Sequence, residues 1–355
     1  MPRVLSIQSS VVHGVVGLGA ATLPLQLHGW EVSPLATVAF SNHSGYPNRG
    51  GAALSAEGLA DLLEGLAANG VGLGDPGAYD AVLTGYVGRA GTVTALGEAL
   101  AKARRQKPGT PAAPAPAPAA SWRLVVDPVL GDEGALYVPP DVVPAYLPLL
   151  AAADVLLPNA TEAVALLNAA GSGGGEAVPP ITTEAGALAA LEALHALGPP
   201  VVIITSTSVQ EWPGAIVLYA SVSDGPTAAA APTRLRVRIP ARPRSFTGTG
   251  DLLAALVTAR LGPGGGGGGR HGRPAPPTPA ALAAALEGAV AGVQAVLART
   301  AAAADAAAPA LAAAGVPAGR EGRRHPAALA AAELRLVESA AELVNPPPGP
   351  AVEWI

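Results

Sequence analysis

The chain has 355 residues, of which 50% are hydrophobic but only 3% aromatic and 13% charged, and it contains 44 glycines and 37 prolines. This composition is typical of a globular protein with low-complexity inserts, and the length suits one large α/β domain or two smaller domains. The net charge of −5 provides no basic surface for nucleic acid or an anionic membrane, and the lack of cysteine excludes disulfides, thiol nucleophiles and Cys-ligated metals.

Short aliphatic runs alternate along the chain with alanine- and leucine-rich stretches of helical period. This alternation predicts a mainly parallel sheet covered by helices on both faces. The predicted strands cover residues 3–8, 35–40, 80–85, 123–127, 154–157, 200–205 and 214–220, and a further run at 234–239 alternates charge with aliphatic residues, as expected near a sheet edge. The predicted helices cover residues 18–28, 55–69, 91–106, 141–152, 161–169, 183–197, 250–262, 280–304 and 327–343.

Four segments have compositions that cannot bury enough apolar surface to offset the entropy of ordering. They are predicted to be surface insertions within one domain, at residues 108–120, 170–180, 263–279 and 305–325. Two apolar regions raise the question of a membrane span, the N-terminal stretch 4–30 and the C-terminal alanine tracts. Polar residues and proline interrupt both, so we predict no membrane span.

The sharpest local motif is a glycine-spaced turn, residues 246–250, that leads directly into an apolar helical run. Crowded backbone N–H groups and the start of a helix favour the binding of an anion here. Asp251 lies in the first turn of this helix, where it could be a helix cap or a general base that takes a proton from a substrate hydroxyl beside a bound phosphate. The chain has no Gly-Lys-Ser/Thr motif, so any nucleotide phosphates must be neutralised mainly by backbone amides and a metal ion.

Two further strands end in acidic segments. The strand before Pro158 leads to Asn159 and Glu162, which either form a helix-capping pair or lie at the mouth of a ligand crevice, where Glu162 could reach Mg²⁺ through water. The strand before Asp127 leads to a loop with Asp132 and Glu133, which is either a solvated acidic loop or a cation site.

Small hydroxyl-bearing and aromatic residues follow several other predicted strands. Ser9 ends the first strand, the segment 40–46 with His43 follows the second, Tyr86 follows the third, and Thr205 and Ser206 end a later one. Such side chains suit a flat, polar heteroaromatic ligand, although a lone histidine is more often a hydrogen-bonded loop residue.

Together and in order, these segments resemble the pyridoxal kinases of the ribokinase-like superfamily. The resemblance runs from Arg3–Ser9 nearly to the C-terminus, where Glu333–Ser339 still follows the family pattern, and the four insertions have no counterpart. It implies a single three-layer α/β/α domain and ATP-dependent phosphorylation of the 5′-hydroxymethyl group of pyridoxal, pyridoxine and pyridoxamine. It also implies Mg²⁺ with ATP, a monovalent cation as a further ligand, a homodimer and a cytoplasmic location.

The resemblance assigns roles residue by residue. Asp251 is the implied catalytic base, in an anion hole with Gly248 and Gly250. The residues implied to hold the vitamer ring are Ser9, Val16, His43, Ser44 and Tyr86, together with Asp251. The residues implied to contact ATP are Asp127, Asn159, Thr205, Ser206, Thr249 and Tyr137, and those implied for the metal are Asp132 and Glu162.

Three residues depart from the family pattern. Ser44 replaces the usual threonine, Val15 replaces a common aromatic residue, and Leu157 replaces a threonine associated with the monovalent cation. Two alternatives stay open at this point. One is a kinase of the same superfamily for a hydroxymethylpyrimidine, and the other is a non-catalytic vitamin B6-binding protein. Retention of Asp251 argues against the second.

Overall fold

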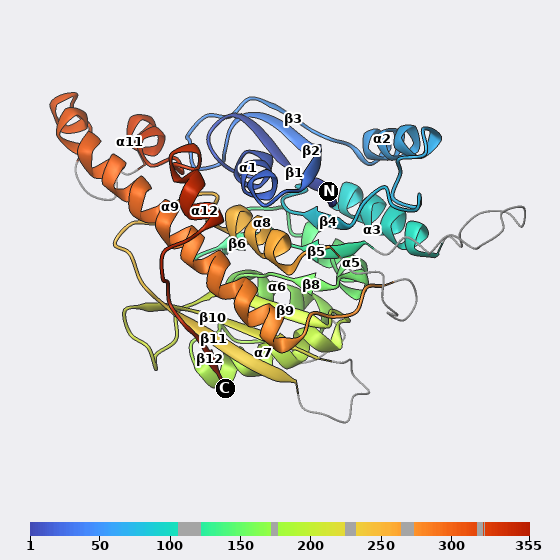
Figure 1. Cartoon of the computed structure of the whole chain (residues 1–355). Coiled ribbons are helices and arrows are strands. Elements are labelled where there is room, and N and C mark those ends of the chain that lie inside the picture. Colours follow the sequence, from blue (N-terminus) through green and yellow to red (C-terminus); the bar gives the residue numbers. More distant parts are fainter. Residues whose placement is uncertain (106–121, 172–176, 224–231, 264–272, 318–321, 323) are drawn as a thin grey trace, which may run out of the picture.

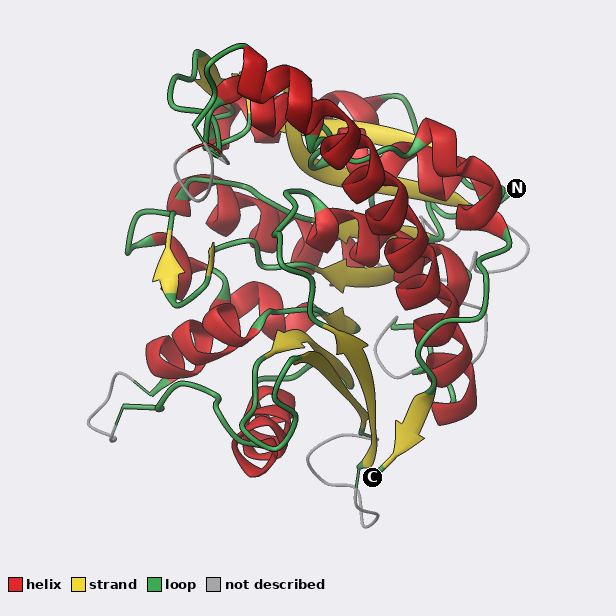
Figure 2. Cartoon of the chain, turned by 90° about the vertical axis from the view of Figure 1, so that its left-hand side faces the viewer, coloured by secondary structure: helices red, strands yellow, loops and turns green. Residues whose placement is uncertain are grey.

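A computed structural model describes residues 1–105, 122–171, 177–223, 232–263, 273–317, 322 and 324–355. Within these residues, ten strands form one sheet in the order β12-β11-β10-β9-β8-β5-β4-β1-β2-β3. The strands from β2 to β9 in this order run parallel, and β3, β10 and β12 pair antiparallel with their neighbours. Figures 1 and 2 show this sheet between two layers of helices, so the predicted three-layer fold with a mainly parallel sheet is confirmed.

The sheet strands extend over β1 Arg3–His13, β2 Glu31–Asn42, β3 Gly51–Ala53, β4 Ala81–Thr84, β5 Arg123–Val126, β8 Val155–Leu156, β9 Val201–Thr207, β10 Ala215–Val222, β11 Thr233–Pro240 and β12 Val352–Trp354. A separate small hairpin joins β6 Gly131–Asp132 to β7 Ala135–Leu136. The helices are α1 Leu18–Leu27, α2 Ala56–Ala68, α3 Ala90–Arg105, α4 Val142–Ala145, α5 Leu147–Ala152, α6 Ala160–Ala170, α7 Glu184–Ala196, α8 Thr249–Leu261, α9 Pro279–Ala313, α11 Pro326–Ala331, the 3₁₀ turn η2 Val337–Ser339 and α12 Ala340–Val344.

The two faces of the sheet carry two separate hydrophobic cores. Successive residues of a strand point to opposite faces, so Val202 and Ile204 of β9 join the core under α3, α6 and α7, while Val201 and Ile203 join the core under α1, α8 and α9. All four side chains are buried. The near-continuous aliphatic runs noted in the sequence therefore reflect strands that are covered on both faces.

Helix α9 is the longest in the described part of the chain, with 35 residues. It is long and apolar enough to cross a membrane by length and composition, but 61% of its most apolar window is buried inside the protein, where it packs on α8 and α12. It therefore has the burial of a core helix.

Several sequence-based predictions of helices and insertions are wrong in detail. Helix α9 continues to Ala313 through Pro309, so the first part of the segment 305–325 is helical and not an irregular insertion, because the surrounding alanines keep a high helix propensity. The predicted helix 327–343 is broken between Ala331 and Val337, and the predicted helix 141–152 divides at Tyr146, just before Pro148. The segment 108–120 and most of the glycine-rich run in 263–279 lie outside the described residues.

The predicted site residues gather at one edge of the sheet because the strands that carry them run parallel. His43 follows β2, Tyr86 follows β4, Asp127 follows β5 and Asn159 follows β8, so all four lie at the carboxyl edge. Strand β11 runs in the same direction as β9, since each is antiparallel to β10. The turn that follows β11 therefore brings the start of α8 to this edge as well.

Candidate active site

The turn at residues 246–250 positions Asp251 in the first turn of α8. Gly248 is the residue before the helix, with a left-handed φ of 84°, and a Cβ at this position would overlap the carbonyl oxygen of Val15. No side chain caps this helix start. The backbone N–H groups of the first turn therefore stay available to an anion.

Asp251 does not cap its own helix. Its Oδ2 accepts a hydrogen bond of 2.8 Å from the backbone N–H of Gly17, in the loop between β1 and α1. Burial raises the pKa of the Asp251 carboxyl to about 6, although the Gly17 hydrogen bond opposes this shift. At neutral pH the group is therefore ionised but more basic than an ordinary aspartate, which suits a proton acceptor.

Asn159 and Glu162 form the helix-capping pair that was one of the two interpretations of their sequence. The Asn159 side chain accepts from the Glu162 N–H at 3.0 Å, and Glu162 Oε2 accepts from the Asn159 N–H at 2.8 Å. Glu162 Oε1 also accepts from the N–H of Leu130 at 2.9 Å, which ties the acidic loop after β5 to the start of α6. The cap thus also places this carboxylate beside the loop.

Asp127 and Glu162 are buried carboxylates of the same region, with 6% and 3% of their surfaces exposed. Burial raises the pKa of Glu162 to about 8 despite the backbone N–H groups that it accepts from. Burial, and then the negative charges of Glu162 and Asp251, raise the pKa of Asp127 well above its ordinary value. In the described part of the chain, no arginine, lysine or histidine forms an ion pair with any of these three carboxylates.

These three carboxyl groups have no cationic partner among the described residues, and the raised pKa values of Asp127 and Glu162 reflect the cost of ionising them together. A ligand that brings its own cation would remove this cost. No group of three or more carboxylate or imidazole side chains among the described residues could hold a metal ion alone. Mg²⁺ commonly keeps several waters and binds through one or two carboxylates plus phosphate oxygens, so this arrangement suits a metal that arrives with a nucleotide. Asp132, at the end of β6, is exposed and accepts from the N–H of Glu133 at 2.8 Å.

Two of the remaining residues implied for nucleotide binding, Thr205 and Tyr137, lie near these carboxylates. Thr205 Oγ1 donates to the carbonyl of Pro158 at 3.4 Å, so the end of β9 packs beside the segment that carries Asn159. Ser206 and Thr249 are partly exposed. Tyr137 follows β7, and 50% of its surface is exposed. The pKa of its hydroxyl is raised, first by desolvation and then by the negative charges of the neighbouring carboxylates.

Three of the residues implied for the vitamer, Ser9, Val16 and His43, lie in or beside the loop between β1 and α1. His43 is 7% exposed, whereas Ser44 beside it is exposed. Ser9 and Val16 are buried, and a Cβ at Gly17 would overlap Ser9. Tyr86 is partly exposed, and its carbonyl accepts from the Thr37 hydroxyl at 2.6 Å.

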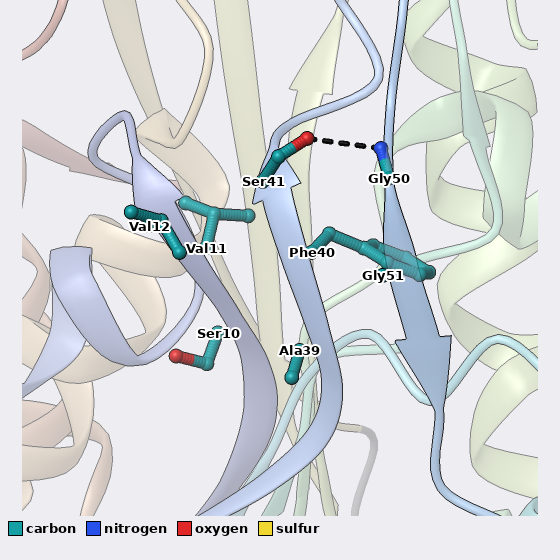
Figure 3. A pocket seen from close by; sticks show the side chains of 8 residues that line it. All are labelled: Ser10, Val11, Val12, Ala39, Phe40, Ser41, Gly50 and Gly51. Carbon is teal, nitrogen blue, oxygen red and sulfur yellow. Dashed lines mark hydrogen bonds between the residues drawn. The ribbon is translucent and has the colours of Figure 1, made fainter.

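A surface hollow of about 440 Å³ lies between β1, β2 and β3, as Figure 3 shows. Phe40 and Val12 are among its lining residues, and the Ser41 hydroxyl accepts from the Gly50 N–H at 2.9 Å across one side. None of the site residues predicted from the sequence lines it. We therefore take the carboxylate cluster, and not this hollow, as the candidate active site.

The sequence analysis missed one residue of this region, Glu333. It lies in the break of the predicted helix 327–343 and accepts hydrogen bonds from His43 at 2.8 Å and from Tyr46 at 3.1 Å. In the sequence, Glu333 belongs to a segment that follows the family pattern, and Glu338 and Glu342 come shortly after it. Its carboxylate therefore does not stand out from its neighbours, and the contact with His43 is visible only in the structure.

Comparisons with known proteins identify the relatives of this chain. Residues 134–266 match the family model described as pfkB family carbohydrate kinase. The chain is 39% identical over 259 residues to pyridoxal kinase from Arabidopsis thaliana, covering 72% of both chains, and 36% identical over 270 residues to pyridoxal kinase from Homo sapiens, covering 72% of this chain and 76% of the human one.

Solved structures are similar over the whole length. The pyridoxal kinase from Leishmania donovani in complex with ADP and ginkgotoxin covers 100% of both chains at 30% identity, with a TM-score of 0.76. The same enzyme with ADP and pyridoxine covers 99% of both chains at 30% identity, with a TM-score of 0.75. The chain therefore belongs to the pyridoxal kinase family and is a kinase with the ribokinase-like fold.

Proposed function

We propose that this chain transfers the terminal phosphoryl group of ATP to the 5′-hydroxymethyl group of pyridoxal, and that pyridoxine and pyridoxamine are further substrates. The observation that carries the proposal is the position of Asp251. Its carboxylate is held beside a glycine turn with free backbone N–H groups, and its pKa of about 6 leaves it ionised at neutral pH. One short segment thus offers both a base and an anion-binding turn.

Asp251 is the proposed catalytic base. Its carboxylate accepts the proton of the 5′-hydroxyl as the hydroxyl oxygen attacks the terminal phosphorus. Gly248 and Gly250 leave room for the transferring phosphoryl group to approach the N–H groups at the start of α8. Gly17 orients the Asp251 carboxylate through its backbone N–H.

The proposed vitamer contacts are Ser9, Val16, His43, Ser44 and Tyr86. His43 and Tyr86 present rings next to strand ends, and Ser9 and Ser44 present hydroxyls. A flat pyridine ring with polar substituents suits this combination of rings and hydroxyls. The positions of Ser9, Val16 and His43 in or beside the loop between β1 and α1, which contacts Asp251 through Gly17, support the assignment.

The proposed nucleotide contacts are Asp127, Asn159, Thr205, Ser206, Thr249 and Tyr137. Tyr137 belongs to the loop after the β6–β7 hairpin, which we propose covers the nucleotide and excludes water. Asp132 and Glu162 are proposed to hold Mg²⁺, Glu162 through water because its two oxygens already accept backbone N–H groups. When bound, Mg²⁺ supplies positive charge that offsets the phosphate oxygens and the buried carboxylates.

Three further properties belong to this proposal. We propose a homodimer, a cytoplasmic location and use of a monovalent cation, each supported by the family resemblance alone. Leu157, which replaces a threonine of the family pattern, is buried and offers no side-chain oxygen to a monovalent cation. Assays with K⁺ and Na⁺, mass photometry and cell fractionation would test these three points separately.

Substitution of Asp251 tests the proposed function. Asp251→Asn keeps the side-chain shape and an oxygen for the Gly17 N–H but removes the base, so we expect kcat with pyridoxal to fall by about 10²–10⁴-fold. ATP affinity, measured by calorimetry, should stay within about twofold because removing the base leaves the nucleotide contacts in place. Asp61→Asn, on the exposed face of α2, is the matched control and should behave as wild type.

Three outcomes would contradict the proposal. A near-normal rate for Asp251→Asn would remove Asp251 from the mechanism. Binding of pyridoxal without release of ADP from MgATP by the unmodified protein would favour a vitamer-binding protein instead. Preference for a hydroxymethylpyrimidine over pyridoxal in direct competition would assign the site to a different heterocyclic alcohol.

A further inference from the structure

Glu333 connects the C-terminal part of the chain to the proposed vitamer pocket. It lies between α11 and η2, and its side chain is 12% exposed. One oxygen, Oε1, accepts from His43 Nε2 at 2.8 Å and from the Tyr46 hydroxyl at 3.1 Å. The other, Oε2, accepts from the backbone N–H of Val15 at 2.8 Å. A single carboxylate therefore bridges the loop after β2 and the loop after β1.

The hydrogen bonds of His43 define its tautomer. The backbone N–H of Gly45 donates to Nδ1 at 3.1 Å, so Nδ1 carries no proton. The proton of the neutral ring is then on Nε2, which donates to Glu333. Tyr46 also donates to Glu333, and its oxygen lies 3.1 Å from His13 Nε2. Glu333 is thus the common acceptor of two side chains next to Ser44.

The loop after β1 lies between Glu333 and the proposed catalytic base. Val15 donates to Glu333, while Gly17, two residues later, donates to Asp251. The carbonyl of Val15 is so close to Gly248 that no side chain fits there. A shift of this loop would therefore change both the position of Asp251 and the turn that precedes α8.

The carboxylate of Glu333 is ionised in this setting. Burial alone would raise its pKa, but the hydrogen bonds from His43, Val15 and Tyr46 outweigh that effect and lower the pKa. A charged acceptor forms stronger hydrogen bonds than a neutral one, so this side chain can hold three donors in place at once.

We propose that Glu333 is a positioning residue for the phosphoryl transfer, which fixes the Nε2–H tautomer and ring orientation of His43 and holds the Val15–Gly17 loop against Asp251. The inference rests on the proposed function, because it assigns a role toward the same substrate. Glu333 touches neither reacting atom and acts through the residues that it orients.

Replacement of Glu333 by glutamine tests this role. The amide keeps the shape but places an N–H₂ group opposite one of the three donors. We expect kcat/KM for pyridoxal to fall at least about tenfold through a higher KM, while KM for ATP stays within about twofold. Glu338→Gln, in the same segment but exposed, is the matched control and should leave all constants unchanged.

A double-mutant comparison separates positioning from a general loss of structure. If Glu333 acts largely through His43, Glu333→Gln should raise KM for pyridoxal much less in a His43→Ala background than in wild type. An equal increase in both backgrounds would overturn the role through His43. A Glu333→Gln protein that matches wild type in both kcat and KM for pyridoxal would overturn the whole inference.

The tautomer can be measured without any substitution at Glu333. Long-range ¹H–¹⁵N spectra of the unmodified protein, assigned by comparison with His43→Ala, should show His43 protonated at Nε2 and not at Nδ1. Protonation at Nδ1 would overturn the inference even if the protein phosphorylates pyridoxal normally. Failure of the wild type to phosphorylate any B6 vitamer would instead contradict the proposed function, so the two failures are distinguishable.

Discussion

Asp251 shows how the surroundings of one residue change its chemistry. In the sequence it could be a helix cap, because carboxylates are common in the first turn of a helix. In the structure it accepts from Gly17, which is 234 positions away in the chain, and its pKa is about 6. The motif predicted the location of this carboxylate, but the Gly17 contact could not be derived from the motif, since it depends on how β1 and α8 meet.

The pH dependence of the reaction follows from this pKa. A base must be deprotonated to act, and the deprotonated fraction of Asp251 decreases as the pH falls through about 6. We expect kcat/KM for pyridoxal to decline below this value and to level off above it. Initial rates at constant MgATP across the acid range would measure the inflection. An acid limb with its midpoint near the ordinary aspartate value would contradict the raised pKa.

The contacts of Glu333 could not be predicted from the sequence. Its partner His43 is 290 positions away, and the helical period of 327–343 predicted a continuous helix. The helix is broken because the chain turns inward at Glu333 to reach three donors. Tertiary contacts of this kind override local helix propensity.

At the scale of elements, the start of α6 combines a structural cap with the proposed nucleotide site. The strand–Pro–Asn–x–x–Glu pattern allowed either reading, and the structure shows that the geometry of the cap itself places Glu162 beside the acidic loop. The strands that carry site residues were predictable from aliphatic runs, whereas β3, β12 and the β6–β7 hairpin were not. These are two or three residues long, too short for a period of two to be recognised.

Asn159→Ala tests whether the cap of α6 serves ATP binding as well as the stability of the helix. The variant loses the bond to the Glu162 N–H and also the 2.7 Å bond from Nδ2 to the Gly131 carbonyl. We expect a loss of about 1–2 kcal/mol in the free energy of unfolding, together with weaker ATP binding because Glu162 is no longer fixed. Urea unfolding and calorimetry would measure the two effects. Thr278→Ala, which removes the cap of α9, should lower stability alone.

At the scale of the whole molecule, an ion-pair network ties several elements together near the starts of β5 and β8. Asp154 is 4% exposed and accepts from Arg104 of α3 at 2.5 Å, from Arg273 at 2.9 Å and from the Leu124 N–H at 2.7 Å. Arg273 lies within the segment 263–279 that was predicted to be a surface insertion, and its contact with Asp154 anchors the described part of that segment to the core. Composition alone gave no indication of this contact.

Asp154→Asn should destabilise the protein without changing its chemistry. Arg104, whose side chain is 8% exposed, would lose its charged partner, and removal of one member of a buried pair typically costs about 3–5 kcal/mol. We expect that loss in urea unfolding at neutral pH, with kcat per folded molecule unchanged. Glu31→Gln removes the half-exposed partner of Arg3 and should cost less than about 1 kcal/mol. Equal losses for the two variants would show that Asp154 contributes no more than a surface pair.

The proposed vitamer side of the pocket joins two segments that are 290 positions apart, since His43 meets Glu333. During biosynthesis the ribosome must release Glu333 before this contact can form, although the strands up to β11 are already complete. A nascent or prematurely terminated product could therefore assemble most of its sheet and still lack an ordered substrate pocket. Competence for the proposed reaction is thereby restricted to polypeptides translated beyond Glu333.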